Sequence, residues 1–250
     1  MTEAVTTERW EKAQSSERRY WDGLDVAELL RISAEKPAFL KLLGDARLRA
    51  LFDGKAVLEI GCGPLGMSVA SFYAGKDRIA RLVKAEPLAR VRLAETGAAG
   101  EPWAAPFVAW VDALTDEGTY QQGAGEDLGF EAEFDTVVTY NVLDHVRDPL
   151  AILRNAHRAL RPGGAILVGV DCLSALGRFR FEHVTRRRAK GTILVDAHPY
   201  SFLPAHVTGM MSRAGFSGLA AFGLPGRLRR LAGSGYRPAF LGSKAAGDHR

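Results

Sequence analysis

The chain has 250 residues, 47% of them hydrophobic and 25% charged, and its formal net charge is +4. This length and hydrophobic content fit one elaborated α/β domain with a substantial core better than two independent domains. No stretch has the ~18 consecutive apolar residues of a membrane span, and the polar N-terminus lacks the apolar run of a signal peptide, so we expect a soluble, cytoplasmic protein with no membrane partner. The two cysteines, Cys62 and Cys172, are expected to be reduced thiols.

Basic residues only slightly outnumber acidic ones, with 33 Lys and Arg against 29 Asp and Glu. Two basic clusters, Arg186–Lys190 and Arg227–Arg230, contain no interleaved aromatic residues and no recognisable nucleic-acid motif. We therefore expect no nucleic-acid partner.

The first predicted elements are helices over Thr7–Gly44, where apolar residues recur among Glu, Lys and Arg. Pro37 predicts a break or a helix start within this segment. Tyr20 and Trp21 are its best candidates for ligand contact. The alternative, that both rings only anchor the segment to the core, stays open.

A strand is predicted over Ala56–Ile60, because five mostly apolar residues are too few for a helix. Gly61, Gly63 and Gly66 follow at G-x-G-x-x-G spacing before a helical pattern resumes. Glycines allow a sharp turn and close ligand approach, and the N–H groups at the start of a helix offer hydrogen bonds. The pattern favours a nucleotide-like ligand, although a close-packed turn with no ligand also explains it.

Glu59 precedes the first glycine by two residues, where a carboxylate repels a pyrophosphate but suits a cation. The stretch Glu59–Gly66 resembles motif I, E/D-x-G-x-G-x-x-G, of the class I S-adenosylmethionine (SAM)-dependent methyltransferases. SAM carries an ammonium and a sulfonium and no phosphate. The resemblance implies a doubly wound, Rossmann-like α/β fold whose seven-stranded sheet is mostly parallel with an antiparallel strand 7, plus an N-terminal helical appendage.

Strand two is predicted over Ile79–Glu86, and Glu86-Pro87 ends it. A carboxylate there can accept hydrogen bonds from both hydroxyls of a ribose. A solvated strand-end glutamate is the alternative. Strand three is expected to be short, over Thr119–Gln122.

The loop Gly125-Glu126-Asp127 lies in a segment that resembles the family pattern G-D-A-E-x-L-P-F, which cradles the adenine. The chain departs from that pattern at Ala124, where Asp is expected, and at Gly129, where Pro is usual. The resemblance therefore leaves Glu126, Asp127 or water to hold the adenine amine.

A fourth strand is predicted over Phe134–Tyr140, followed by a loop and a helix that begins near Pro149. The segment L-R-P-G-G then precedes a strand over Ala165–Asp171. This order is the most specific part of the resemblance, which covers Ala56–Asp171.

The C-terminal part contains an irregular segment, a helix over Leu203–Ala214, and strands over Phe216–Phe222 and Arg237–Ser243. The resemblance implies two regions: an N-terminal helical lid over residues 1–50, and a SAM-binding domain over residues 51–250. It also implies that the irregular insertion at about 172–200 forms the acceptor pocket.

The resemblance assigns cofactor-binding roles by position. Gly61 and Gly63 approach the methionine and ribose, Glu59 orients the amino group through a backbone amide or water, and Asn141 faces the methionyl group. The predicted cofactor-binding set is Glu59, Gly61, Gly63, Glu86, Pro87, Gly125, Glu126, Asp127 and Asn141.

Histidines are the candidate bases, because their unperturbed pKa is near 6.5. We rank His198 ahead of His145, which more readily shapes the pocket floor, and His183 follows them. Tyr140 is placed with them in the methyl-transfer zone. No His-x-His or Glu-x-x-His spacing predicts a metal.

The resemblance implies in-line methyl transfer from SAM to a small-molecule acceptor, for example a secondary metabolite, with S-adenosylhomocysteine (SAH) as product. Two alternatives stay open: SAM-assisted elimination or cyclisation without methyl transfer, and a non-catalytic SAM-binding subunit. An NAD-dependent oxidoreductase is disfavoured by Glu59 and by the P-G-G segment. A homo-oligomer or a hetero-oligomer is compatible with the sequence.

Overall fold

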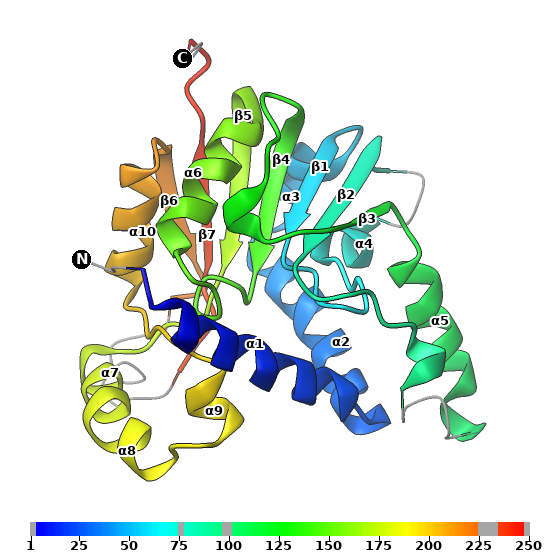
Figure 1. Ribbon diagram of the computed structural model, residues 1–250. Coiled ribbons are helices and arrows are strands. Elements are labelled where there is room, and N and C mark those ends of the chain that lie inside the picture. Colours follow the sequence, from blue (N-terminus) through cyan, green and yellow to red (C-terminus); the bar gives the residue numbers. More distant parts are fainter. Residues whose placement is uncertain (1–3, 75–77, 97–101, 225–234, 248–250) are drawn as a thin grey trace.

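The protein is built on one seven-stranded sheet, which the computed structural model shows with the order β3-β2-β1-β4-β5-β7-β6 (Figure 1). The structure describes residues 4–74, 78–96, 102–224 and 235–247. The strands are β1 Ala56–Ile60, β2 Arg81–Glu86, β3 Thr119–Gln122, β4 Phe134–Tyr140, β5 Leu160–Gly169, β6 Ser217–Phe222 and β7 Ala239–Ser243. Only β7 runs against its neighbours, β5 and β6. The predicted fold, mostly parallel with an antiparallel strand 7, is confirmed.

Helices cover both faces of this sheet. Apolar side chains of α6 (Pro149–Ala159) and α10 (Pro204–Arg213) form one core with one face of β1, β4 and β5. The opposite face packs against α3 (Asp45–Phe52) and α4 (Val69–Ala74). Strand side chains alternate between the faces, so Val57 joins the second core and Leu58 the first. Figure 1 shows the sheet between these two helical layers.

The N-terminal helices are α1 (Thr7–Asp22) and α2 (Val26–Lys41), each begun by a side-chain cap, from Thr6 and Asp25. The break or helix start predicted at Pro37 is wrong, because α2 runs through that residue. Burial on both sides of Pro37, from Leu29 to Leu40, holds the two halves of the helix in line. In Figure 1, α1 crosses the end of the sheet at which β1 and β4 finish.

A third core joins these helices to α5 (Ala105–Thr115), through Leu24, Leu29, Met67 and Val111 among others. Within the described parts of the connections, short 3-10 helices lie at Leu93–Glu95, Pro102–Ala104 and Gly125–Asp127. Among the described residues, no helix has both the length and the apolar character needed to cross a membrane.

The segment expected to be irregular, at about 172–200, is largely helical. It contains α7 (Ala175–Arg180), a π-helical turn (Phe181–Thr185), α8 (Arg186–Arg188) and α9 (Ile193–Asp196). These helices are too short for an apolar periodicity to emerge from the sequence. The basic cluster at 186–190 belongs to this segment, whereas the cluster at 227–230 lies outside the described residues.

Candidate active site

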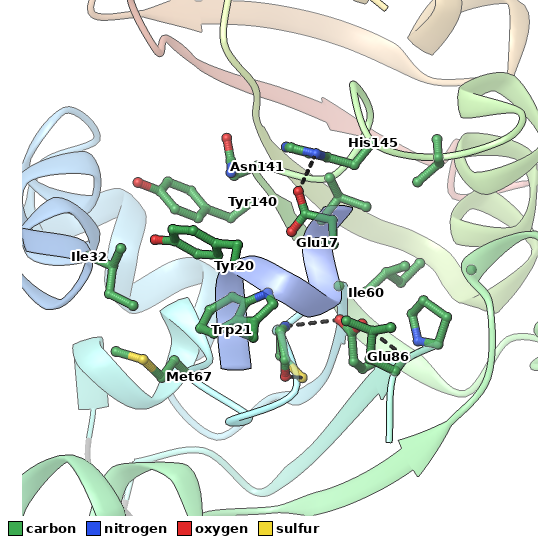
Figure 2. Close-up of a pocket in the computed structure, with 18 of the residues that line it drawn as sticks. Glu17, Tyr20, Trp21, Ile32, Ile60, Met67, Glu86, Tyr140, Asn141 and His145 are labelled. Atoms are coloured by element: carbon green, nitrogen blue, oxygen red, sulfur yellow. Dashed lines mark hydrogen bonds and ion pairs between the residues drawn. The ribbon is translucent and has the colours of Figure 1, made fainter. Parts of the chain in front are cut away.

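Two adjoining cavities lie where the parallel strands end beneath the N-terminal helices. The first, here the glycine-loop cavity, has a volume of about 430 Å³ and is lined by Gly61, Gly63, Glu86 and Asn141 among others (Figure 2). The second, here the insertion cavity, has a volume of about 710 Å³ and is lined in part by the 172–201 segment. Both cavities are lined by Arg31, Glu35, Tyr140, Asp171, Leu194, His198 and Arg237.

The glycine loop after β1 leaves no room for side chains. Gly61 and Gly63 have φ angles of +78° and +74°, a region that favours glycine. A Cβ atom on Gly61 would overlap the side chain of Val142, and one on Gly63 would lie 2.8 Å from the ring of Trp21. Trp21 on α1 therefore packs directly on the loop.

Glu59 is buried at the base of this loop and holds the first turn of α4. Its carboxylate accepts hydrogen bonds from the backbone N–H groups of Val69 at 2.8 Å and Ala70 at 3.2 Å, and from the Ser68 hydroxyl at 2.6 Å. Burial raises the pKa of Glu59 against the effect of these hydrogen bonds. Because both oxygens are already bonded, Glu59 acts on a ligand by fixing the loop.

Glu86 ends β2 and closes the other side of the loop. Its oxygens accept the N–H of Gly63 at 3.0 Å and of Leu88 at 3.1 Å. Burial raises the pKa of Glu86 to about 7. Each oxygen retains a lone pair for a further donor, and the next residue, Pro87, also lines the cavity. This geometry leaves Glu86 able to accept ribose hydroxyls.

The structure brings only part of the predicted adenine loop to the cavity. Gly125 and Glu126 line it, whereas Asp127 is exposed and does not. The Glu126 carboxylate accepts the backbone N–H of Arg147 at 2.9 Å and of Asp148 at 3.2 Å. Its role is thus to tie this loop to the one after β4.

Asn141 and Tyr140 lie at the end of β4, as predicted. Asn141 has φ +58°, uncommon for a residue other than glycine, and its side-chain oxygen is buried without a hydrogen-bond partner. The Tyr140 hydroxyl accepts a hydrogen bond from Arg237 at 2.8 Å, and burial raises the pKa of Tyr140. Tyr140 is therefore a poor proton acceptor, whereas the Asn141 oxygen is free to receive a donor.

His145 is held as a cation. Its Nδ1 atom lies 2.9 Å from a Glu17 carboxylate oxygen and 2.9 Å from the Ala197 carbonyl oxygen. Burial opposes protonation, but the negative charges of Asp144 and Glu17 outweigh it and raise the pKa of His145 to about 10. At neutral pH His145 carries a proton and is unsuited to accept another, which agrees with a role in shaping the pocket.

His198 is held neutral beside it. Burial, followed by the positive charge of His145, lowers the pKa of His198. The two rings lie 4.3 Å apart between centroids, and His198 Nδ1 lies 3.4 Å from the Ile193 carbonyl oxygen. A carbonyl only accepts, so we assign the proton to Nδ1, which leaves a lone pair on Nε2.

Asp144 stands between the two histidines. Its Oδ2 atom lies 3.7 Å from His145 Nε2 and 3.8 Å from His198 Nε2, while its Oδ1 atom is buried with no hydrogen-bond partner. One donor atom from each residue lies within 4.8 Å of the others, a spacing that a metal ion would also accept. Local sequence spacing misses this cluster because His198 is distant from Asp144 along the chain.

Sequence reasoning also missed a charged network between the two cavities. Arg237 donates to both oxygens of Asp171 at 2.9 Å and pairs with Glu35 of α2 at 2.9 Å. Arg31, on the same helix, pairs with Glu35 and Glu28. No local motif marks these residues, because they come together only when α2, the loop after β5 and the segment before β7 assemble. By contrast, His183 is exposed and lines neither cavity.

Comparison with known proteins gives relatives with the same fold. A Thermotoga maritima SAM-dependent methyltransferase superposes with a TM-score of 0.55 at 20% identity, over 94% of this chain and 99% of that one. A phosphoethanolamine N-methyltransferase 2 from Haemonchus contortus, solved with SAM, gives a TM-score of 0.55 at 16% identity, over 85% of this chain and 52% of that one.

Curated relatives share more of the sequence. The ubiquinone biosynthesis O-methyltransferase of Pseudomonas aeruginosa strain UCBPP-PA14 is 33% identical over 124 residues, 48% of this chain and 46% of the relative. The protein of that name from Xanthomonas euvesicatoria is 30% identical over 171 residues, 65% of this chain and 62% of the relative. The chain thus matches about half the length of the former.

The family model described as "Methyltransferase domain" matches residues 34–221. The chain therefore belongs to the methyltransferase domain family, among the class I SAM-dependent methyltransferases.

Proposed function

We propose that this protein binds SAM in the glycine-loop cavity and transfers its methyl group to a hydroxyl oxygen of a small aromatic acceptor held in the insertion cavity. The observation that carries the proposal is the neutral His198, which lies at the junction of the two cavities. Curated relatives named O-methyltransferases support an oxygen acceptor. Apolar and aromatic side chains of the insertion cavity support an aromatic one: Phe39, Leu173, Phe181, Leu194 and Tyr236.

The residues of the glycine-loop cavity fit SAM. Glu86 presents a carboxylate to ribose hydroxyls, and Gly61 and Gly63 line the same cavity beside it. The unpartnered oxygen of Asn141 suits the methionyl ammonium. SAM supplies a methyl group activated by its attachment to positive sulfur.

His198 acts as the general base in this proposal. As the acceptor oxygen forms its bond to the methyl carbon and the carbon–sulfur bond breaks, the hydroxyl proton passes to His198 Nε2. Asp144 Oδ2, 3.8 Å from that atom, stabilises the resulting imidazolium. A positioned base of this kind contributes about 10²–10⁴-fold to the rate.

The role of the surrounding charges is to keep this base ready. The cation on His145 disfavours a second positive charge nearby and so keeps His198 unprotonated before the reaction. Glu17 and Asp144 in turn hold the cation on His145. Alignment of the two substrates across the cavities supplies the rest of the rate gain, as in other well-oriented reactions.

The test is incubation with SAM labelled in its methyl group and a panel of catechols and simple phenols. The expected result is label in a methyl ether product. SAH binding without label in any product, across hydroxyl, amine and carbon acceptors, would instead favour a non-catalytic SAM-binding subunit. If a substrate is consumed only when SAM is present, but its product carries no labelled methyl group, elimination or cyclisation would be favoured. Either outcome overturns the proposal.

A further inference from the structure

Three lysines are buried among the residues that the structure describes, and one differs from the other two. Lys36, Lys84 and Lys244 are only 8%, 1% and 6% exposed. Lys84 donates to the Gly66 and Thr115 carbonyl oxygens, and Lys244 donates to the Leu160 carbonyl oxygen at 3.0 Å. Among the described residues, no hydrogen-bond acceptor or ion-pair partner is found for the Lys36 ammonium.

Two aromatic rings contact this ammonium. Its nitrogen lies 5.5 Å from the Tyr140 ring centroid and 5.8 Å from that of Phe72. Such contacts are favourable for a cation, but they leave all three N–H donors without an acceptor. A buried charge normally has a partner, so this arrangement indicates one that comes from outside the chain.

The nearby carboxylates are already engaged. Glu59 accepts three hydrogen bonds around the start of α4, and Glu35 pairs with Arg31 and Arg237. Burial lowers the pKa of Lys36 to about 8, and the charges of Glu59 and Glu35 only partly offset this effect. An anionic ligand would supply the negative charge beside the Lys36 ammonium that these carboxylates do not.

The position of Lys36 limits which ligand group it meets. It lines the glycine-loop cavity together with Gly61, Cys62 and Glu86. Ile32, one turn earlier on α2, and Met67 lie on the opposite side of Trp21 from Glu86 in Figure 2. One cavity is thus lined both by Glu86 and by Ile32 and Lys36 of α2, so a ligand with its ribose at Glu86 can extend toward α2.

We propose that Lys36 binds the α-carboxylate of the methionyl part of SAM. This assignment rests on the proposed function and adds a residue from α2 to the cofactor site. The carboxylate is the single anionic group of SAM, and it lies at the end of the molecule away from the adenine. The other cations that face the cavity, Arg31 of α2 and Arg237 from the segment before β7, already have carboxylate partners.

The experiment compares two ligands on three proteins by titration calorimetry. SAH carries the carboxylate, and 5′-methylthioadenosine is the same nucleoside thioether without the amino-acid end. Lys36→Met keeps an apolar stem beneath the rings of Tyr140 and Phe72, and Lys41→Met changes an exposed lysine of the same helix. We expect Lys36→Met to weaken SAH binding about 10- to 100-fold, the range for a hydrogen bond to a charged group, and methylthioadenosine binding by less than about twofold.

The outcomes separate this inference from the proposed function. If the unaltered protein binds SAH and Lys36→Met binds it equally well, the inference fails and the proposed function stands. Equal losses for the two ligands also overturn it, because Lys36 would then shape the cavity without contacting the carboxylate. If the unaltered protein binds neither ligand, the proposed function fails and the inference falls with it. Retained methylthioadenosine binding shows that the variant is folded.

Discussion

The two walls of the glycine-loop cavity are built differently. On the sheet side, every carboxylate oxygen of Glu59 and Glu86 accepts a hydrogen bond, from the glycine loop, from the start of α4 or from Leu88 after β2. On the side of α2 and the loop after β4, Asn141 Oδ1 and His145 Nε2 are buried without hydrogen-bond partners, and Lys36 has no hydrogen-bond acceptor among the described residues. The sheet side fixes the loop, and its Glu86 keeps lone pairs for a ligand, whereas the other side holds polar groups that have no partner of their own. We therefore expect substitutions on the first to act mainly on binding and substitutions on the second mainly on chemistry or ligand selectivity.

The largest effect is expected from His198→Gln, which removes the base and leaves the sheet side intact. The turnover number should fall by about 10²–10⁴-fold, with little change in SAH affinity. In the unaltered protein, activity should rise with pH through the lowered pKa of His198 and be level near neutrality; the variant should lose this acidic limb. Steady-state kinetics from pH 5 to 8 measure the turnover number and its pH dependence.

The exposed His183 in the same insertion provides the matched control, because it lines neither cavity. His183→Gln should retain full activity. If the two variants have the same turnover number, His198 is not the base, and the expectation that this wall acts on the chemistry is wrong.

A smaller effect is expected from Gly61→Ala on the sheet side. The added Cβ would overlap Val142 at a φ of +78°, so the loop must shift, and SAH affinity should fall by about 10- to 100-fold. Gly123→Ala is the control, because a Cβ there meets no atom within 4 Å. Unaltered SAH binding by Gly61→Ala in calorimetry would contradict the placement of SAM against this loop.

A third test changes the charge that holds His145. Because the pKa of His145 is raised to about 10 in the folded protein, its stabilising contribution is complete below about pH 6.5 and is lost as pH rises through 10. Glu17→Gln should lower the free energy of unfolding by about 1–3 kcal/mol at pH 6 and flatten its decline toward pH 10. Urea unfolding at several pH values measures this, with exposed Glu11→Gln as control. Parallel curves for the two variants would show that Glu17 does not hold the proton on His145.

The smallest effect should come from metal removal. If Asp144 and His198 act as a proton-transfer pair, dialysis against EDTA should change the turnover number by less than about twofold. Activity that is lost on chelation and restored by Mg²⁺ or Mn²⁺ would instead assign these residues as metal ligands. The same assay on His198→Gln would then report metal affinity.

The sequence was sufficient wherever a short local pattern decides the structure. The strands at Thr119–Gln122 and Phe134–Tyr140 have the predicted bounds, because turn residues and apolar runs delimit them. The continuity of α2 across Pro37 and the short helices of the 172–200 segment were not predictable, because tertiary packing decides them. For the site, the predicted glycines, Glu86 and Asn141 share one cavity, but Asp127 lies outside it. Glu17, the ion-pair partner of His145, and Arg237, which engages Glu35 beside Lys36, lie far away along the chain, and no local spacing marks them.

The contact between Trp21 and Gly63 has a consequence for ligand access. A ligand that lies on the Gly63 backbone needs the space that the Trp21 ring now fills, so α1 must shift before that ligand can bind there. Glu17 lies about one turn from Trp21 on the same helix, and it is the ion-pair partner of His145. We therefore expect a shift of α1 that admits such a ligand to move Glu17 as well, and so to change the pKa of His145.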